Sequence, residues 1–170
     1  MSSGEAVGSL AETGVKLPVV IPSLAAVKFW VQTPLGETDW VPIFQERIDR
    51  FAEATDDRQW IHVDVERARR ESIWKQTIAH GYLTLSMIPE LLSRLVVIIG
   101  VKTAINTGID KLRFSAPVLS GSRVRLKAEI KDAREMPDHA VRISFAVRVE
   151  VEGGSKPALL ANVNYLYYPV

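Results

Sequence analysis

Two segments in the C-terminal half of the chain alternate regularly between apolar and polar side chains. The first covers residues 123–131 and the second covers residues 141–152. Because successive side chains of a β-strand point to opposite faces, this alternation predicts two long strands, each with one face on a core and one in water. Met136-Pro137-Asp138 between them is typical of a turn, so we expect the two strands to pair antiparallel.

The rest of the chain predicts shorter strands and several helices. Further strand candidates cover residues 38–44, 101–106, 111–114 and 158–168. Helix candidates cover residues 24–32 (capped by Ser23 and ended by Pro34 and Gly36), 45–54, 65–71 (capped by Asp64) and 82–97 (kinked or broken at Pro89 and ended by Gly100). Helices come first and an antiparallel meander follows, with one long apolar helix between them. The expected class is α+β, with a sheet wrapped around a buried helix.

Composition limits the classes of protein to which the chain can belong. Its 170 residues suit one domain; residues 1–22 are expected to be a flexible arm and residues 23–170 the folded domain. A net charge of +1 argues against a main role in coating nucleic acid or an anionic membrane. No apolar run approaches the roughly 20 residues of a membrane span, and the first fifteen residues contain no Lys or Arg. We therefore expect a soluble, cytoplasmic protein.

The absence of cysteine excludes several further kinds of functional site. Without it the chain has no disulfide, thiolate nucleophile, zinc finger or iron–sulfur cluster, and three histidines remain for imidazole chemistry.

The densest group of side chains that could act as acids, bases or hydrogen-bonding groups lies in residues 55–64. Asp57 and His62 are five positions apart there, and a helix ending near Thr55 would let both side chains face one water molecule. Spacing alone favours a capping role for these residues over a catalytic one.

Four pieces of sequence in register resemble one known family. They are Asp57-x-x-x-x-His62 within Gln59-Trp60-Ile61-His62-Val63-Asp64, Ile78-Ala79-His80-Gly81-Tyr82-Leu83-Thr84, residues 104–118 and Lys156-Pro157-Ala158. Together they resemble the MaoC-like dehydratases and (R)-specific enoyl-CoA hydratases, most closely the nodulation-protein-N branch. The resemblance covers about residues 23–168. Asp56 and Thr107 depart from the usual residues of the family and leave the range of substrates open.

The resemblance implies a hot-dog fold, a homodimer with active sites at the subunit interface, and a hydro-lyase acting on acyl-CoA or acyl-carrier-protein thioesters without a metal or a cofactor. By this resemblance, Asp57 and His62 would hold the water and transfer its protons. The Gly81 amide would donate a hydrogen bond to the thioester carbonyl. Gln59 is expected on the substrate side. Asn106 either contacts the pair or substrate, or is a turn residue at the end of a strand.

Two other functions stay compatible with the same residues. A hot-dog thioesterase would direct the activated water at the carbonyl carbon, and a non-catalytic module would only bind the thioester. The pair His62-x-Asp64 supplies two potential metal ligands without a third, so we expect no metal site, and Asp64 is better explained as a helix cap. His80 is expected to position Gly81.

Overall fold

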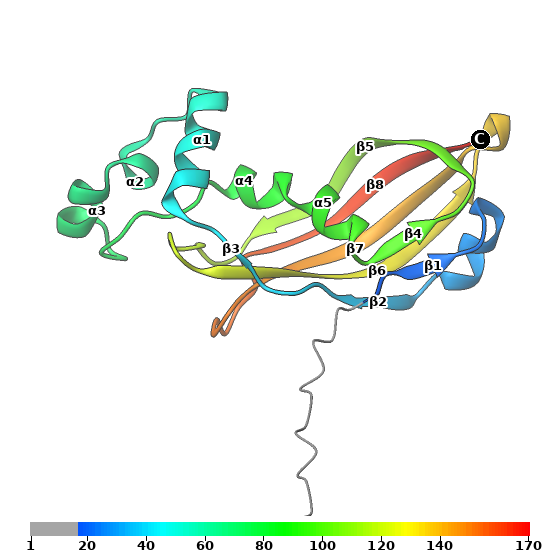
Figure 1. Ribbon diagram of the computed structural model, residues 1–170, viewed down its shortest axis with the longest axis horizontal. Helices are drawn as coiled ribbons and strands as arrows, with labels where there is room; N and C mark the ends of the chain where they lie inside the picture. Colours follow the sequence, from blue (N-terminus) through cyan, green and yellow to red (C-terminus); the bar gives the residue numbers. More distant parts are fainter. Residues whose placement is uncertain (1–16) are drawn as a thin grey trace, which may run out of the picture.

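The structure is a computed structural model that describes residues 17–170, so residues 1–16 of the expected arm lie outside the described part. Helices and short strands precede four long strands, which confirms the α+β class (Figure 1). The elements are β1 (Val19–Ile21), η1 (Leu24–Trp30), β2 (Thr33–Glu37), β3 (Val41–Pro42), α1 (Gln45–Thr55), α2 (Trp60–Val63), α3 (Val65–Glu71), α4 (Gly81–Ser86), α5 (Ile88–Ser93), β4 (Val96–Ile98), β5 (Val101–Phe114), β6 (Arg123–Glu135), η2 (Pro137–His139), β7 (Val141–Val151) and β8 (Leu159–Pro169).

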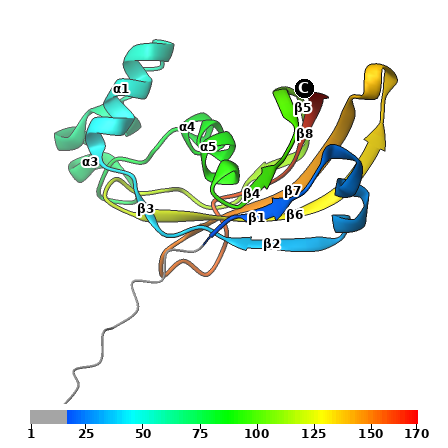
Figure 2. The same cartoon turned by 45° about the vertical axis from the view of Figure 1, so that its right-hand side comes forward.

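The main sheet contains six strands in the order β2-β6-β7-β8-β5, with β3 also paired to β6. Its pairings are antiparallel, and β6 and β7 form the predicted long pair with Val124 opposite Val151 and Glu135 opposite Val141. The sheet curls around α4 and α5, which lie on its concave face (Figure 2). This arrangement is the hot-dog fold that the sequence predicts.

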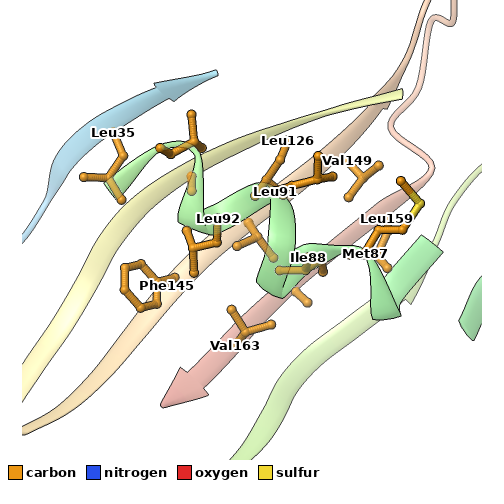
Figure 3. Packing of buried hydrophobic residues seen from close by; sticks show 14 of the residues in the cluster. Leu35, Met87, Ile88, Leu91, Leu92, Leu126, Phe145, Val149, Leu159 and Val163 are labelled. Atoms are coloured by element: carbon orange, nitrogen blue, oxygen red, sulfur yellow. The ribbon is translucent and has the colours of Figure 1, made fainter. Parts of the chain in front are cut away.

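The core lies between the concave face of the sheet and the α5 helix. Ile88, Leu91 and Leu92 of α5 are each at most 4% exposed and pack against the apolar faces of the strands (Figure 3). Leu126 and Phe145 on the sheet are fully buried. Burying side chains of this size is worth about 1.5–3 kcal/mol each, so these contacts fix the position of the helices on the sheet.

The helix expected over residues 82–97 is broken near Pro89, as the sequence allows, but its expected end at residue 97 is wrong. The segment forms two short helices that meet at Met87, and Pro89 occupies the first turn of α5, where its missing N–H is not needed. Val96–Ile98 then form strand β4, which pairs in parallel with β1. Because β1 begins at Val19, the folded domain extends further toward the N-terminus than the expected boundary at residue 23.

The segment between residues 23 and 44 also differs from its prediction. Ser23 caps a helix as expected, with its Oγ accepting a bond of 3.2 Å from the Ala26 N–H, but the helix is of the 3-10 type and ends at Trp30. Pro34 and Gly36 flank a bulge in edge strand β2 instead of terminating a helix. An edge position tolerates proline because its nitrogen needs no strand partner. The strand expected over residues 38–44 is reduced to Val41–Pro42.

The two short strands expected over residues 101–106 and 111–114 form one strand, β5, which runs from Val101 to Phe114. Irregularities between Asn106 and Gly108 and between Asp110 and Arg113 interrupt its register with β8. These local shifts explain why the sequence shows no continuous alternation here.

Helices α1, α2 and α3 lie together beyond one end of the sheet (Figure 1). The expected helix over residues 45–54 is confirmed as α1, and the Asp64 cap of α3 is confirmed by a bond of 2.9 Å from the Arg67 N–H to Asp64 Oδ1. Among residues 17–170, no helix has the length and apolar character needed to cross a bilayer.

Candidate active site

Asp57 lies just after α1, at a point where the backbone changes direction. The helix ends at Thr55, and Asp56 takes a left-handed conformation with φ of 59°. Asp residues tolerate this conformation better than most, and it is a common way to end a helix. The turn places the Asp57 side chain, which is 52% exposed, toward the N-terminus of α4. The expected loop after Thr55 is present, but it is followed by the short helix α2, which the sequence does not predict.

His62 is held by a buried hydrogen bond in the short helix α2. Its ring is 7% exposed, and Nδ1 lies 2.7 Å from the carbonyl oxygen of Ile78. Because a carbonyl only accepts, this contact assigns the ring hydrogen to Nδ1 and leaves Nε2 with a free lone pair. The Ile78 N–H in turn donates to the Ile61 carbonyl at 3.0 Å. His62 can therefore accept a proton at Nε2 without losing its anchor.

Gln45 supports the same region from the first turn of α1. Its Nε2 donates to the His62 carbonyl at 2.7 Å, and its Oε1 accepts from the Thr77 hydroxyl at 2.5 Å. The side chain thus links α1, α2 and the segment before α4. Sequence reasoning missed Gln45, because a glutamine at a helix start carries no signal of contacts 17 and 32 residues away.

Asp57, His62 and His80 form one cluster. One ligand-type atom from each lies within 4.8 Å of those of the other two. A carboxylate oxygen and a ring nitrogen at this separation can share one bridging water. The same three residues could in principle ligate a metal, because the hydrogens on Nδ1 of His62 and Nε2 of His80 leave the other nitrogen of each ring with a free lone pair. The same arrangement of a carboxylate beside a neutral imidazole also suits acid–base chemistry on water.

Gly81 and His62 line one cavity of about 290 Å³, together with Trp74, Phe114 and Ala158. Gly81 is the first residue of α4, and its N–H donates no hydrogen bond to residues 17–170. A Cβ built on Gly81 would lie 3.0 Å from Cε1 of Phe114, so the absence of a side chain is what keeps this approach open. The amide is available to a ligand in the cavity.

The other two predicted site residues are not part of this cluster. Gln59 is exposed and contributes its backbone N–H, 3.5 Å from Oδ1 of Asp57. Asn106 lies on β5 opposite Tyr165, eight residues before Phe114, which corresponds to roughly 26 Å along an extended strand. Within one chain, Asn106 therefore lies far along β5 from the end that lines the cavity of His62 and Gly81.

The environment of His62 makes its protonation unfavourable. Burial lowers the pKa of His62 below its ordinary value of 6.5, and the neighbouring His80 ring acts in the same direction. The hydrogen bond to Ile78 and the Asp57 charge act in the opposite direction but do not cancel the effect of burial. At neutral pH His62 is therefore the neutral base that acceptance of a proton from water requires.

This lowered pKa predicts a pH dependence of stability. Between the folded pKa of His62 and 6.5, the unfolded chain binds more protons than the folded chain. The contribution of His62 to the free energy of unfolding should therefore be greatest above about pH 7 and should decrease as the pH falls through this window. Urea unfolding between about pH 5 and about pH 8 measures the slope. His62→Asn, whose amide can still donate to Ile78, should flatten it. His139→Asn is the matched control, because His139 is exposed and its φ of 57° suits asparagine. Equal slopes in both variants would contradict the prediction.

Comparisons with known proteins agree with this geometry. The model of the "MaoC like domain" family matches residues 28–154. The 3-hydroxyacyl-thioester dehydratase Z of Mycobacterium tuberculosis is 46% identical over 127 residues, which cover 75% of this chain and 83% of the relative. Nodulation protein N of Rhizobium leguminosarum bv. viciae is 40% identical over 141 residues, which cover 82% of this chain and 88% of the relative.

A solved structure supports the fold over a longer range. The monoamine oxidase regulatory protein of Archaeoglobus fulgius superposes with a TM-score of 0.72 at 22% identity, covering 91% of this chain and 99% of that one. The match to the family model and the matches to the two relatives all include Asp57, His62 and Gly81. This chain therefore belongs to the MaoC-like domain family.

Proposed function

We propose that the protein is an (R)-specific enoyl-thioester hydratase, or in the reverse direction a 3-hydroxyacyl-thioester dehydratase, and thus a hydro-lyase. The observation that carries this proposal is the approach of the Asp57 carboxylate and the His62 ring to within 4.8 Å beside the unoccupied amide of Gly81. The 46% identity to a 3-hydroxyacyl-thioester dehydratase of M. tuberculosis supports the same reaction. An acyl-CoA or an acyl-carrier protein would supply the thioester.

The proposed reaction uses water as the nucleophile. A water held between Asp57 and Nε2 of His62 attacks C3 of the enoyl thioester while the pair takes one of its protons. Negative charge then develops on the thioester oxygen, where the Gly81 N–H at the start of α4 would donate a hydrogen bond. The proton taken from water is delivered to C2, so that one water adds across the double bond. Dehydration follows the same steps in reverse, and no electron is exchanged with a cofactor.

The test is to incubate the protein with crotonyl-CoA and follow the enoyl absorbance and the free thiol together. We expect the absorbance to fall with no release of thiol. Release of thiol would favour the thioesterase, and no change in either signal would favour a non-catalytic module. Supplying (R)- and (S)-3-hydroxybutyryl-CoA separately tests the stereochemistry, because only the (R) substrate should regain enoyl absorbance.

We also propose that two copies pair through β5 to form a homodimer. This strand is the last in the order of the sheet, and among the described strands its outer edge has no partner. Ile105, Ile109 and Phe114 on it are 51%, 37% and 46% exposed, and a long apolar edge strand is a template for a second strand. Antiparallel pairing centred near Asp110, midway between 106 and 114, would bring Asn106 beside the Phe114 end of the second copy. Asn106 would then reach the second copy's cavity.

Ile105→Glu is expected to shift the protein from dimer to monomer, because two such strands would bring carboxylates into a buried edge. Light scattering coupled to size exclusion measures the mass directly. Ile73→Glu serves as the control, since Ile73 is 83% exposed and lies in the loop after α3 rather than on β5. A wild-type protein that elutes as a monomer at micromolar concentration would contradict the pairing.

A further inference from the structure

His80 lies against both members of the acid–base pair, whereas sequence reasoning favours a role in positioning Gly81 over donation to substrate. Its ring is 2% exposed and stacks on the His62 ring, with centroids 3.8 Å apart and planes at 26°. Its Nε2 lies 2.9 Å from the Asp57 carbonyl oxygen and 4.0 Å from Oδ2 of the same residue. From α1 it is contacted by the ring of Phe51, at 5.0 Å between centroids.

The ring nitrogens of His80 do not cap the helix that follows it. His80 is the N-cap residue of α4, yet its side chain makes no capping hydrogen bond. Because the Asp57 carbonyl only accepts, Nε2 carries the hydrogen and donates it there. The buried Nδ1 has no hydrogen-bond partner among the described residues. A buried polar atom without a partner costs stability, and such a cost is a common mark of a residue retained for function.

We propose that His80 is a positioning residue that holds Asp57 and His62 at the distance at which they can share a water. The bond from Nε2–H fixes the peptide of Asp57 at the point where the chain leaves the left-handed Asp56. The stacked ring fixes the plane of His62, whose other anchor is the single bond to Ile78. This inference rests on the proposed hydratase activity, because it assigns His80 a part in placing that same pair.

The mechanism explains why a histidine suits this position. Asp57 is half exposed and lies in a loop, so without a donor its backbone would be free to move. A flat ring of this size fills the space between Phe51 and His62 and still presents an N–H at its far end. Small displacements of reacting groups cost large factors in rate, so a group that never touches substrate can control turnover.

The decisive comparison is between His80→Asn and His80→Gln. The two amides differ by one methylene, and only that of glutamine extends to the position of Nε2, where it can donate to the Asp57 carbonyl. We expect His80→Asn to lower kcat at least about tenfold, the cost of one well-placed hydrogen bond, with KM within about twofold. His80→Gln should recover most of this loss. Crotonyl-CoA kinetics measure both constants.

His80→Phe provides a second, independent variant. It keeps a stacked ring of similar size but has no donor, so kcat should fall as in His80→Asn. Wild-type kcat in either donor-free variant would overturn the inference. So would a glutamine variant as impaired as the asparagine variant, with both folded by circular dichroism. Wild type and Asp57→Asn are measured alongside. An inactive wild type refutes the proposed function itself, whereas an active wild type with unimpaired His80 variants refutes only the role of His80.

Discussion

Asp57→Asn is expected to lower kcat for hydration of crotonyl-CoA by about 10²–10⁴, the usual contribution of a positioned acid or base. The amide has the shape of the carboxylate but cannot take a proton from water. The fold should be unaffected, because the Asp57 side chain is 52% exposed and its one contact with a buried side chain, Oδ2 to Nε2 of His80, is 4.0 Å long. KM should change little, since substrate binding is assigned to the cavity beyond Gly81.

Asp56→Asn is the matched control for this prediction. Asp56 is the adjacent carboxylate, it is exposed, and asparagine accepts its left-handed φ of 59° as readily as aspartate. We expect this variant to keep activity near that of wild type. If the two asparagine variants lost activity equally, the effect would come from the net charge of the loop rather than from proton transfer at Asp57.

His62→Asn tests the other member of the pair. The asparagine amide can replace Nδ1 as the donor to the Ile78 carbonyl, so the anchor of the loop is retained while the basic Nε2 is lost. We expect a loss of kcat comparable to that of Asp57→Asn. The double variant should be little worse than either single variant, because residues that act as a unit are not additive.

The parts of the fold that the sequence predicts are those with regular periodicity and a buried face. The alternation over residues 123–131 and 141–152 predicts β6 and β7 because each turns one face to the core. The apolar pattern of residues 82–97 continues through both short helices and into β4, so periodicity does not separate two short helices from one long helix. It also cannot show that Val96–Ile98 leave the helix to pair with β1. That pairing joins segments far apart in the chain and depends on tertiary contacts.

The same distinction applies to the site. Asp57 and His62 are close in sequence, and a helix end at Thr55 is enough to predict that they can meet. His80 lies 23 residues from Asp57, and Gln45 lies 17 residues from His62, so no local pattern links them. The motif resemblance brings Gly81 into the site, but the roles of Gln59 and Asn106 stay predictions. For Asn106 the reason is physical: its proposed contact belongs to a second copy of the chain.

Gly81→Ala is expected to lower kcat/KM for crotonyl-CoA by about 10², the lower range for losing one donor to a developing oxyanion. The substitution keeps the N–H but adds a methyl group 3.0 Å from the Phe114 ring. Because that ring is 46% exposed, it can move instead of unfolding the chain, and it would then enter the cavity that both residues line. Steady-state kinetics together with a thermal melt separate lost activity from lost stability.

Phe114→Leu distinguishes the two ways in which the added methyl group could act. If the methyl group acts by displacing the ring, the smaller leucine should relieve the contact, and the double variant Gly81→Ala/Phe114→Leu should regain much of the lost activity. If the methyl group itself keeps the thioester from the amide, the double variant should stay as slow as Gly81→Ala. Full activity in Gly81→Ala alone would contradict the expectation that close approach to the Gly81 backbone matters for turnover.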